Sequence, residues 1–151
     1  MYALLAGYAR RARWAVPFTA AVFAVDQGTK LAATAVHPST FVLNGRQPSL
    51  WGTVAIVVTM VVVLGLPFTP ATLASAVWAG GAAGNLLDAY FWPGGVPDFI
   101  RAAPFAGTWN LADAFIAAGV AGLGLALILW VAVAPWRLSR LSAHARAQVA
   151  D

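Results

Sequence analysis

Four long apolar stretches dominate the chain and constrain its fold more than any other feature. They cover residues 14–36, 51–68, 71–88 and 111–134. Each is close to the about 20 residues that a helix needs to cross roughly 30 Å of hydrocarbon. The chain is 61% hydrophobic and only 9% charged, whereas a soluble domain is about 25% charged. The sequence therefore predicts an all-α integral membrane protein. We expect one domain over residues 1–151, a bundle of four transmembrane helices with a short irregular outer loop region.

The basic residues indicate how this bundle is oriented. Arginines cluster in residues 10–13 and 137–146, just before the first stretch and just after the fourth. Because positive residues near membrane helices stay on the cytoplasmic side, both termini are expected in the cytoplasm. The connections 37–50 and 89–109 then face outward.

The composition excludes several kinds of chemistry. The chain has no cysteine, so disulfides, zinc–thiolate sites and a cysteine nucleophile are ruled out. His37 and His144 stand near opposite ends of the chain, which disfavours a histidine metal site. The excess of basic residues could suggest a nucleic-acid partner, but their clustering near the termini fits membrane orientation better. We therefore expect no cofactor, no metal and no nucleic acid.

All five acidic residues are aspartates, and four lie in or against apolar segments: Asp26, Asp88, Asp98 and Asp113. A carboxylate at the centre of a membrane helix costs about 2.5–3.5 kcal/mol on insertion scales, so such residues mark functional sites. Asp151 ends a tail, from residue 138 onward, that we interpret as a solvated cytoplasmic end. The other four aspartates are the candidates for a site.

Asp26 and Lys30 lie four residues apart in the outer half of the first stretch. This order favours an ion pair along a helix. The plain structural interpretation is a self-neutralising pair, with Lys30 reaching outward to the interface. A cleaved signal peptide is an alternative for this stretch, but the two charges interrupt the apolar core that it would need.

The third stretch ends in a glycine-rich run, 80–84, followed by Asn85 and Asp88. Small residues let helices approach closely in lipid. Asn85 and Asp88 are three residues apart and share a helix face. The C-terminus of a helix disfavours negative charge, so Asp88 needs a donor or cationic partner, and Lys30 and Arg101 are the candidates.

Asp98 and Asp113 fall at the same expected outer boundary. In the plain interpretation Asp98 is a turn residue after proline, Asn110 caps the fourth helix, and Asp113 lies in its first turn. However, the Asn-x-x-Asp spacing of residues 110–113 repeats that of residues 85–88. A cap alone does not predict this repetition.

Two carboxylates that share a proton can hydrolyse a peptide bond. One takes a proton from water while the other protonates the scissile carbonyl. A helix N-terminus favours the charged form of Asp113, so Asp98 in its apolar segment is expected to hold the shared proton. The pair titrates as a unit. This interpretation predicts an aspartic-type membrane endopeptidase.

Four motifs, in order, resemble those of the lipoprotein signal peptidase (signal peptidase II) family. The family's Asp-x-x-Thr-Lys motif matches residues 26–30, and its Gly-Gly-x-x-Gly-Asn-x-x-Asp-Arg motif resembles residues 80–88. Its Val-x-Asp-Phe-Ile motif matches residues 96–100, and its Phe-Asn-x-Ala-Asp-Ser motif is similar to residues 109–114. The resemblance covers nearly the whole of residues 14–134.

This resemblance implies a monomeric enzyme of the bacterial cytoplasmic membrane with its active site toward the outer face. It implies removal of signal peptides from diacylglyceryl-modified prolipoproteins, with cleavage before the lipidated cysteine, so the partners are this substrate and membrane lipid. The implied catalytic pair is Asp98 and Asp113. The residues implied to orient the pair and substrate, or to support the site, are Asp26, Lys30, Asn85, Asp88 and Asn110, with Asn44 and Arg101 as further candidates.

The sequence departs from the family pattern after Asp88, where Ala89 replaces an arginine implicated in holding the substrate main chain. Arg101 and Arg46 are candidate replacements for that arginine. The first outer segment, 37–50, is also shorter than the β-rich cradle that family members place there.

Asn44 and Gly45 are at most a remnant of the family's Asn-x-Gly motif in that cradle. In the fourth motif, Trp109 stands in place of phenylalanine and Ala114 in place of serine. The chain therefore resembles a divergent member with a shortened first outer loop.

Two other functions remain open. A non-catalytic paralogue would bind lipopeptides or confer inhibitor resistance; Ala89 favours it, and the intact Asp98 and Asp113 oppose it. A small transporter or proton-relay subunit would use the acids as carriers. The position of all four acids toward one face, rather than across the bilayer, argues against a relay.

Overall fold

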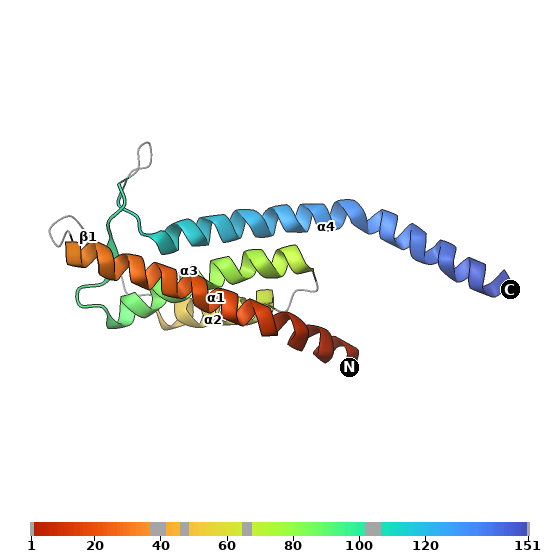
Figure 1. Cartoon of the computed structure of the whole chain (residues 1–151), viewed down its shortest axis with the longest axis horizontal. Coiled ribbons are helices and arrows are strands. Elements are labelled where there is room, and N and C mark those ends of the chain that lie inside the picture. Colours follow the sequence, from red (N-terminus) through yellow and green to blue (C-terminus); the bar gives the residue numbers. More distant parts are fainter. Residues whose placement is uncertain (1, 37–41, 46–48, 65–67, 102–106, 151) are drawn as a thin grey trace.

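The protein is described here by a computed structural model, which covers residues 2–36, 42–45, 49–64, 68–101 and 107–150. Four helices and two short strands follow one another in these ranges: α1 (Tyr2–Val36), β1 (Val42–Asn44), α2 (Leu50–Leu64), α3 (Thr69–Phe91), β2 (Val96–Asp98) and α4 (Leu111–Ala150). The strands lie at one end of the helical bundle, and both termini lie toward the opposite end (Figure 1).

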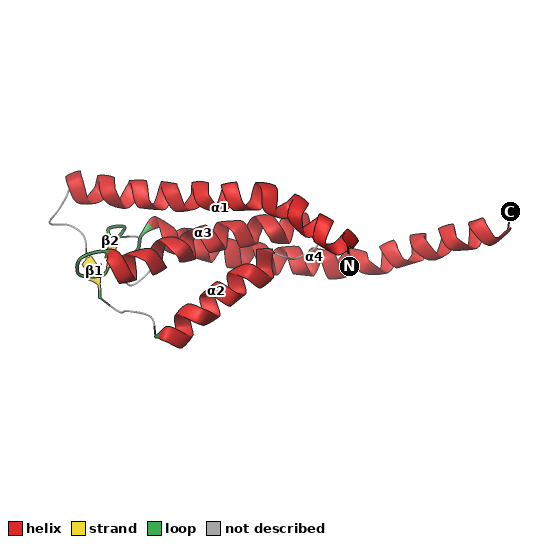
Figure 2. Ribbon diagram, turned by 90° about the horizontal axis from the view of Figure 1, so that it is seen from below, coloured by secondary structure: helices red, strands yellow, loops and turns green. Residues whose placement is uncertain are grey.

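Helix α3 is the centre of the bundle. It packs against the other three helices, most extensively against α4 and then against α1. Helix α2 diverges from the bundle toward its own N-terminus (Figure 2). The buried face of α3 consists mostly of small residues: Ala71, Thr72, Ser75, Ala76, Ala79, Gly80, Gly81, Ala82, Gly84 and Ala89. Small side chains permit this close helix packing, which supplies the association energy that hydrophobicity cannot provide in lipid.

Two adjacent glycines set the distance from α3 to its main neighbours. A Cβ atom at Gly80 would lie 2.6 Å from Val22 Cβ on α1. A Cβ atom at Gly81 would lie 2.6 Å from the Ala112 carbonyl oxygen on α4. Neither contact is sterically allowed, so α1 and α4 approach α3 more closely than alanine would permit.

Within the described residues, length and composition identify one helix that could cross a membrane, Leu111–Trp136 in α4. Its mean hydropathy is 2.4, and only 11% of its apolar window is buried in the protein. Leu50–Val62 in α2 is apolar but shorter. The buried polar residues of α1 and α3 lower the hydropathy of those helices. The protein is thus helical, with a membrane-spanning candidate, and the crossing of all four helices stays a prediction.

The helices overlap the four predicted stretches but differ at their ends. Helix α4 continues to Ala150, well past residue 134, with Pro135 inside it. The tail that we interpret as a solvated cytoplasmic end is therefore helical as far as Ala150. Helix α2 ends at Leu64, and residues 65–67, which follow it, lie outside the described residues.

The expectation of an irregular outer region is wrong for the two segments that form strands. Strands β1 and β2 pair antiparallel, with Val42 opposite Asp98 and Asn44 opposite Val96. Gly94 and Gly95 precede β2 with φ angles of +89° and +107°, which glycine adopts readily. The shortened first outer loop therefore still contributes a strand, and this strand lies beside the one that carries Asp98.

A second backbone contact returns the chain to this sheet. Trp109 N–H donates to the Ile100 carbonyl at 2.9 Å, and Ile100 N–H donates to the Trp109 carbonyl at 2.7 Å. This bridge brings the start of α4 next to β2. It places Asn110 within reach of Asp98.

Candidate active site

The first turn of α4 is closed by a reciprocal pair of hydrogen bonds. Asp113 N–H donates to Asn110 Oδ1 at 3.1 Å, and Asn110 N–H donates to Asp113 Oδ2 at 3.0 Å. This is the pattern of a capping box, with aspartate in place of glutamate at the third helical position. The expected cap is confirmed, and the same bonds hold the Asp113 carboxylate beside Asn110.

Asp98 is also hydrogen-bonded to Asn110. It is the last residue of β2 and is only 7% exposed. Asn110 Nδ2 donates to Asp98 Oδ1 at 2.7 Å. Asn110 is therefore hydrogen-bonded to both aspartates that the sequence suggests as a catalytic pair.

Burial of the carboxyl raises the pKa of Asp98 above its ordinary value. The negative charge of Asp113 raises this pKa further, and the hydrogen bond from Asn110 lowers it in part. Both raising effects act against the charged form. The direction of the pKa shift is the one expected for a carboxyl that holds a proton.

Asn85 on α3 connects this pair to α1. Its Nδ2 donates to Asp113 Oδ1 at 2.8 Å. Its Oδ1 accepts from Asn110 Nδ2 at 3.1 Å and from Lys30 Nζ at 3.0 Å. Each polar end of the Asn85 amide is therefore engaged by a group from another element.

Lys30 is completely buried, with 0% exposure. Its Nζ lies 2.7 Å from Asp26 Oδ2 and 2.5 Å from Asp88 Oδ2. The predicted ion pair with Asp26 is confirmed, and Lys30 is the cationic partner that Asp88 requires. The interpretation in which Lys30 reaches outward is wrong, because two buried carboxylates and Asn85 hold the ammonium inside the bundle.

Asp26 also binds the backbone of α4. Its Oδ1 accepts from Ala112 N–H at 2.8 Å. The positive end of a helix dipole lies at its N-terminus, so a carboxylate is favoured there. On the other side of Asp26, a Cβ atom at Gly84 would overlap Oδ2. The last glycine of the run 80–84 therefore leaves room for this carboxylate.

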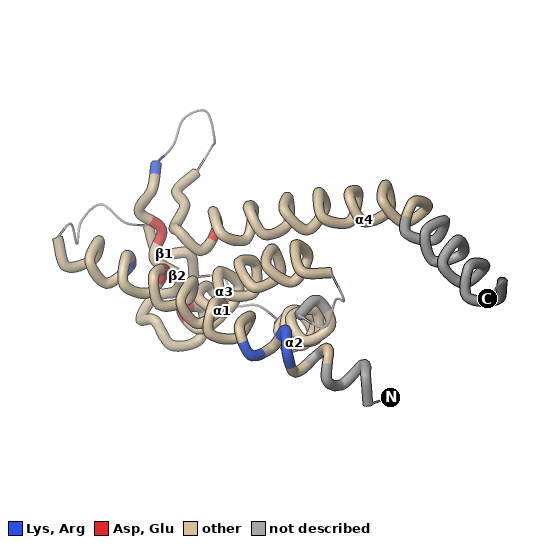
Figure 3. Tube along the Cα trace, turned by 45° about the vertical axis from the view of Figure 1, so that its right-hand side comes forward, with Lys and Arg blue, Asp and Glu red and all other residues tan. Residues whose placement is uncertain are grey.

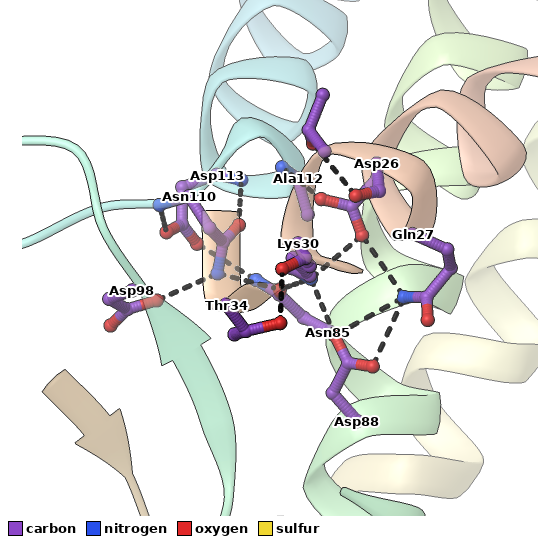
Figure 4. Close-up of polar contacts among 11 residues, drawn as sticks. Asp26, Gln27, Lys30, Thr34, Asn85, Asp88, Asp98, Asn110, Ala112 and Asp113 are labelled. Atoms are coloured by element: carbon purple, nitrogen blue, oxygen red, sulfur yellow. Dashed lines mark hydrogen bonds and ion pairs between the residues drawn. The ribbon is translucent and has the colours of Figure 1, made fainter. Parts of the chain in front are cut away.

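These contacts gather residues from α1, α3, β2 and α4 into one polar network at the strand end of the bundle. Figure 3 shows the acidic residues collected at this end, away from the basic residues of α1 near the N-terminus. Figure 4 shows the side chains converging around Lys30, Asn85 and Asn110. Among the described residues, no group of three His, Cys, Asp or Glu side chains is arranged to hold a metal ion.

Sequence reasoning did not identify Gln27 as part of this network. Its Nε2 donates to Asp88 and lies within hydrogen-bond distance of Asp26. The available signal was a second polar side chain next to Asp26 in a membrane stretch, which became informative only once α3 was placed beside α1.

The further candidates for holding the substrate are exposed or lie outside the described residues. Asn44 is exposed at the end of β1, opposite Val96. Arg101 is exposed just after Ile100. Arg46 lies outside the described residues. Ala89 is buried at 7% exposure, so its face of α3 is packed.

The fold and the site define a class: a helical membrane protein with paired aspartates where its helices meet a small sheet. A sequence model of the family described as signal peptidase (SPase) II matches residues 39–129, which is more than half of the chain. The chain belongs to the signal peptidase II family, and it is thus related to membrane hydrolases that process lipoproteins. The family resemblance drawn from the four motifs is confirmed.

A comparison with solved structures supports the fold. The chain is similar to a structure titled as a bacterial membrane enzyme solved by the in meso method at 2.3 Å resolution. The two share 19% sequence identity with a TM-score of 0.56, over 78% of this chain and 88% of the other. No curated protein sequence matches the chain significantly.

Proposed function

We propose that this protein is an aspartic endopeptidase that removes signal peptides from diacylglyceryl-modified prolipoproteins, cutting before the lipidated cysteine. It acts as a monomer in the bacterial cytoplasmic membrane, with four spans, both termini in the cytoplasm and its site toward the outer face. Family membership supports the reaction class. The strand end of the bundle, opposite both termini, supports this orientation.

One observation carries the proposal: Asn110 is hydrogen-bonded to both Asp98 and Asp113. Its side-chain amide donates to Asp98 at 2.7 Å, and its backbone N–H donates to Asp113 at 3.0 Å. A single residue therefore holds two carboxylates from different elements in one place. Two acids held together in this way, one with a raised pKa, suit chemistry in which they share one proton.

In the proposed reaction, Asp113 is the ionised partner and accepts a proton from the attacking water. Its carboxylate faces two N–H donors, which suit a charged acceptor. Asp98 carries the proton and gives it to the oxygen of the scissile carbonyl as water adds to the carbon. When the tetrahedral intermediate collapses, the C–N bond breaks, the leaving nitrogen takes the proton held by Asp113, and Asp98 takes back a proton from a hydroxyl of the intermediate, so that the pair returns to its starting state.

The test is cleavage of a purified diacylglyceryl-modified prolipoprotein by the wild-type protein, Asp98→Asn and Asp113→Asn. The proposal is supported if the wild-type protein cleaves before the lipidated cysteine and each substitution abolishes this cleavage, provided that all three proteins unfold cooperatively. Cleavage that survives both substitutions rules out the pair, and no cleavage by folded wild-type protein rules out the activity.

Position 89 bears on how the substrate is held. Ala89 stands where the family has an arginine, and we propose that Arg101 supplies the missing positive charge from the segment after β2. Because Arg101 is exposed, Arg101→Ala should raise KM for the prolipoprotein without lowering the unfolding temperature. An unchanged KM would remove Arg101 from the substrate site.

A non-catalytic paralogue that binds lipopeptides is the second candidate, and buried Ala89 is the observation that favours it. It predicts lipopeptide binding by the folded wild-type protein without cleavage. The same assay, supplemented by a binding measurement with an uncleaved lipopeptide, distinguishes the two functions.

A further inference from the structure

Gln27 spans the two carboxylates that surround Lys30. It follows Asp26 on α1, and its Nε2 lies 3.3 Å from Asp26 Oδ2. The same nitrogen lies 3.1 and 3.3 Å from the two oxygens of Asp88, which is 61 residues away in the sequence. Figure 4 shows this amide facing both acids. Neither the sequence motifs nor the proposed reaction assigns it a role.

Lys30 determines how the Asn85 amide is oriented. An ammonium group has three N–H donors and no acceptor, and the three recorded partners of Lys30 are Asp26, Asp88 and Asn85. Because Lys30 can only donate, Asn85 must turn its Oδ1 toward it. The Nδ2 of Asn85 then points to Asp113. A rotated amide would set NH2 against the ammonium and oxygen against the carboxylate, so both contacts would be unfavourable.

The position of Lys30 depends in turn on the two acids on either side of it. Two carboxylates and one ammonium leave an excess negative charge in a buried region, where charges are weakly screened. Asp26 and Asp88 therefore repel each other unless other donors lie between them. Gln27 provides such a donor to both acids without adding charge. It allows the two carboxylates to stay close together with Lys30 between them.

We propose that Gln27 is a positioning residue of the active site. It keeps the carboxylates of Asp26 and Asp88 in contact with Lys30. Lys30 Nζ therefore continues to donate to Asn85 Oδ1, and Asn85 Nδ2 continues to donate to Asp113. Gln27 acts through these residues and does not touch the substrate. The inference rests on the proposed function, in which Asp113 is one of the catalytic pair.

Two substitutions test the role of the amide. Gln27→Met keeps an unbranched chain but removes the donor. Gln27→Glu keeps the shape and donates only when protonated. The matched control is Thr34→Val on the same helix, because Thr34 donates to the backbone carbonyl of Lys30, at 2.9 Å, rather than to its side chain.

With the prolipoprotein as substrate, Gln27→Met should lower kcat on the order of tenfold, as supporting residues commonly do, and leave KM unchanged. For Gln27→Glu the deficit in kcat relative to wild type should grow as the pH rises. Thr34→Val should keep the wild-type kcat and pH profile. A wild-type kcat in Gln27→Met, or a deficit in Gln27→Glu that does not vary with pH, would overturn the proposal.

A second measurement does not depend on activity. The chain contains three asparagines, Asn44, Asn85 and Asn110, so selective 15N labelling gives three side-chain amide signals, and Asn85→Ala assigns the one of interest. The Asn85 signal should shift in Gln27→Met and stay in place in Thr34→Val. An unmoved signal in Gln27→Met contradicts the positioning role. If wild-type protein fails to cleave but the signal shifts, the positioning role holds and the proposed function fails.

Discussion

Asn110 and Asp113 hold each other by two reciprocal hydrogen bonds, at 3.0 and 3.1 Å. Asp113 therefore belongs both to the cap of α4 and to the proposed catalytic pair. Asn110 also donates to Asp98, so the bonds that start the helix place the two carboxylates together. Stability and activity should consequently depend on different atoms of Asn110.

Substitutions at Asn110 can separate these two contributions. Serine is a good N-cap but lacks the amide donor to Asp98, whereas alanine provides neither. Both Asn110→Ser and Asn110→Ala should lose most cleavage activity, and Asn110→Ala should be less stable than Asn110→Ser by about 1 kcal/mol, the usual value of a cap. Chemical unfolding in detergent, with a cleavage assay, checks this. Equal stabilities of the two variants would show that the cap contributes nothing.

The raised pKa of Asp98 predicts a stability that depends on pH. An acid whose pKa is raised in the folded state favours folding at low pH, where it is protonated, and this contribution is lost as the pH rises through the raised pKa. Asp98→Asn removes that loss, because its amide cannot ionise. The variant should therefore unfold at a higher temperature than wild type near neutral pH. This gap in unfolding temperature between the two proteins should disappear as the pH falls toward the ordinary pKa of aspartate, about 3.9.

Thermal unfolding across this pH range measures the gap between the two proteins. Asp151→Asn is the matched control, because it removes an acid at the last residue, far along the chain from the site. A gap of constant size at every pH would mean that Asp98 does not ionise differently in the folded protein.

Gly84 should tolerate no larger residue, because a Cβ atom there would overlap Asp26 Oδ2. Gly84→Ala should displace this carboxylate from Lys30 and from Ala112 N–H, and destabilise the protein by about 1–3 kcal/mol, as overpacking does. Cleavage activity should fall as well. The comparison is Gly28→Ala on α1, where the added Cβ would have no atom within 4 Å apart from its chain neighbours and the adjacent backbone of its own helix. That change should be neutral or stabilising, since alanine favours helices by up to about 1 kcal/mol over glycine.

Lys30→Met should be the most destabilising of these substitutions. It leaves Asp26 and Asp88 buried without their cation, and breaking a buried ion pair in this way typically costs about 3–5 kcal/mol. The triple variant Lys30→Met, Asp26→Asn, Asp88→Asn neutralises the whole cluster and should recover much of the loss. Unfolding free energies in detergent test this order. If the triple variant is no more stable than Lys30→Met, packing rather than charge explains the effect.

Local features of the sequence were sufficient to predict the helices and parts of the site. A continuous run of apolar residues indicates a helical segment. The four-residue spacing of Asp26 and Lys30 places both on one helix face, independently of the tertiary contacts. The cap formed by Asn110 and Asp113 likewise depends on residues three positions apart. The family motifs bring these pieces together, and the match over residues 39–129 confirms the family.

Other parts of the site depend on residues that are far apart in the chain. The strand that contains Asn44 pairs with the strand that contains Asp98, and a short outer loop has no sequence pattern that specifies this partner. Gln27 donates across 61 residues to Asp88. Lys30 is buried rather than directed outward because α3 brings a second carboxylate and Asn85 against it.

The sequence by itself determined an apolar helical chain, the ion pair along one helix and the cap at the start of another, because hydropathy, capping and helical spacing act over a few residues. The tertiary structure alone decided which of these polar groups meet. Only the close packing of α1 and α4 on the glycines of α3 brings Lys30, Asn85, Asn110 and the aspartates within hydrogen-bond distance, and a buried polar group is stable only where such partners reach it.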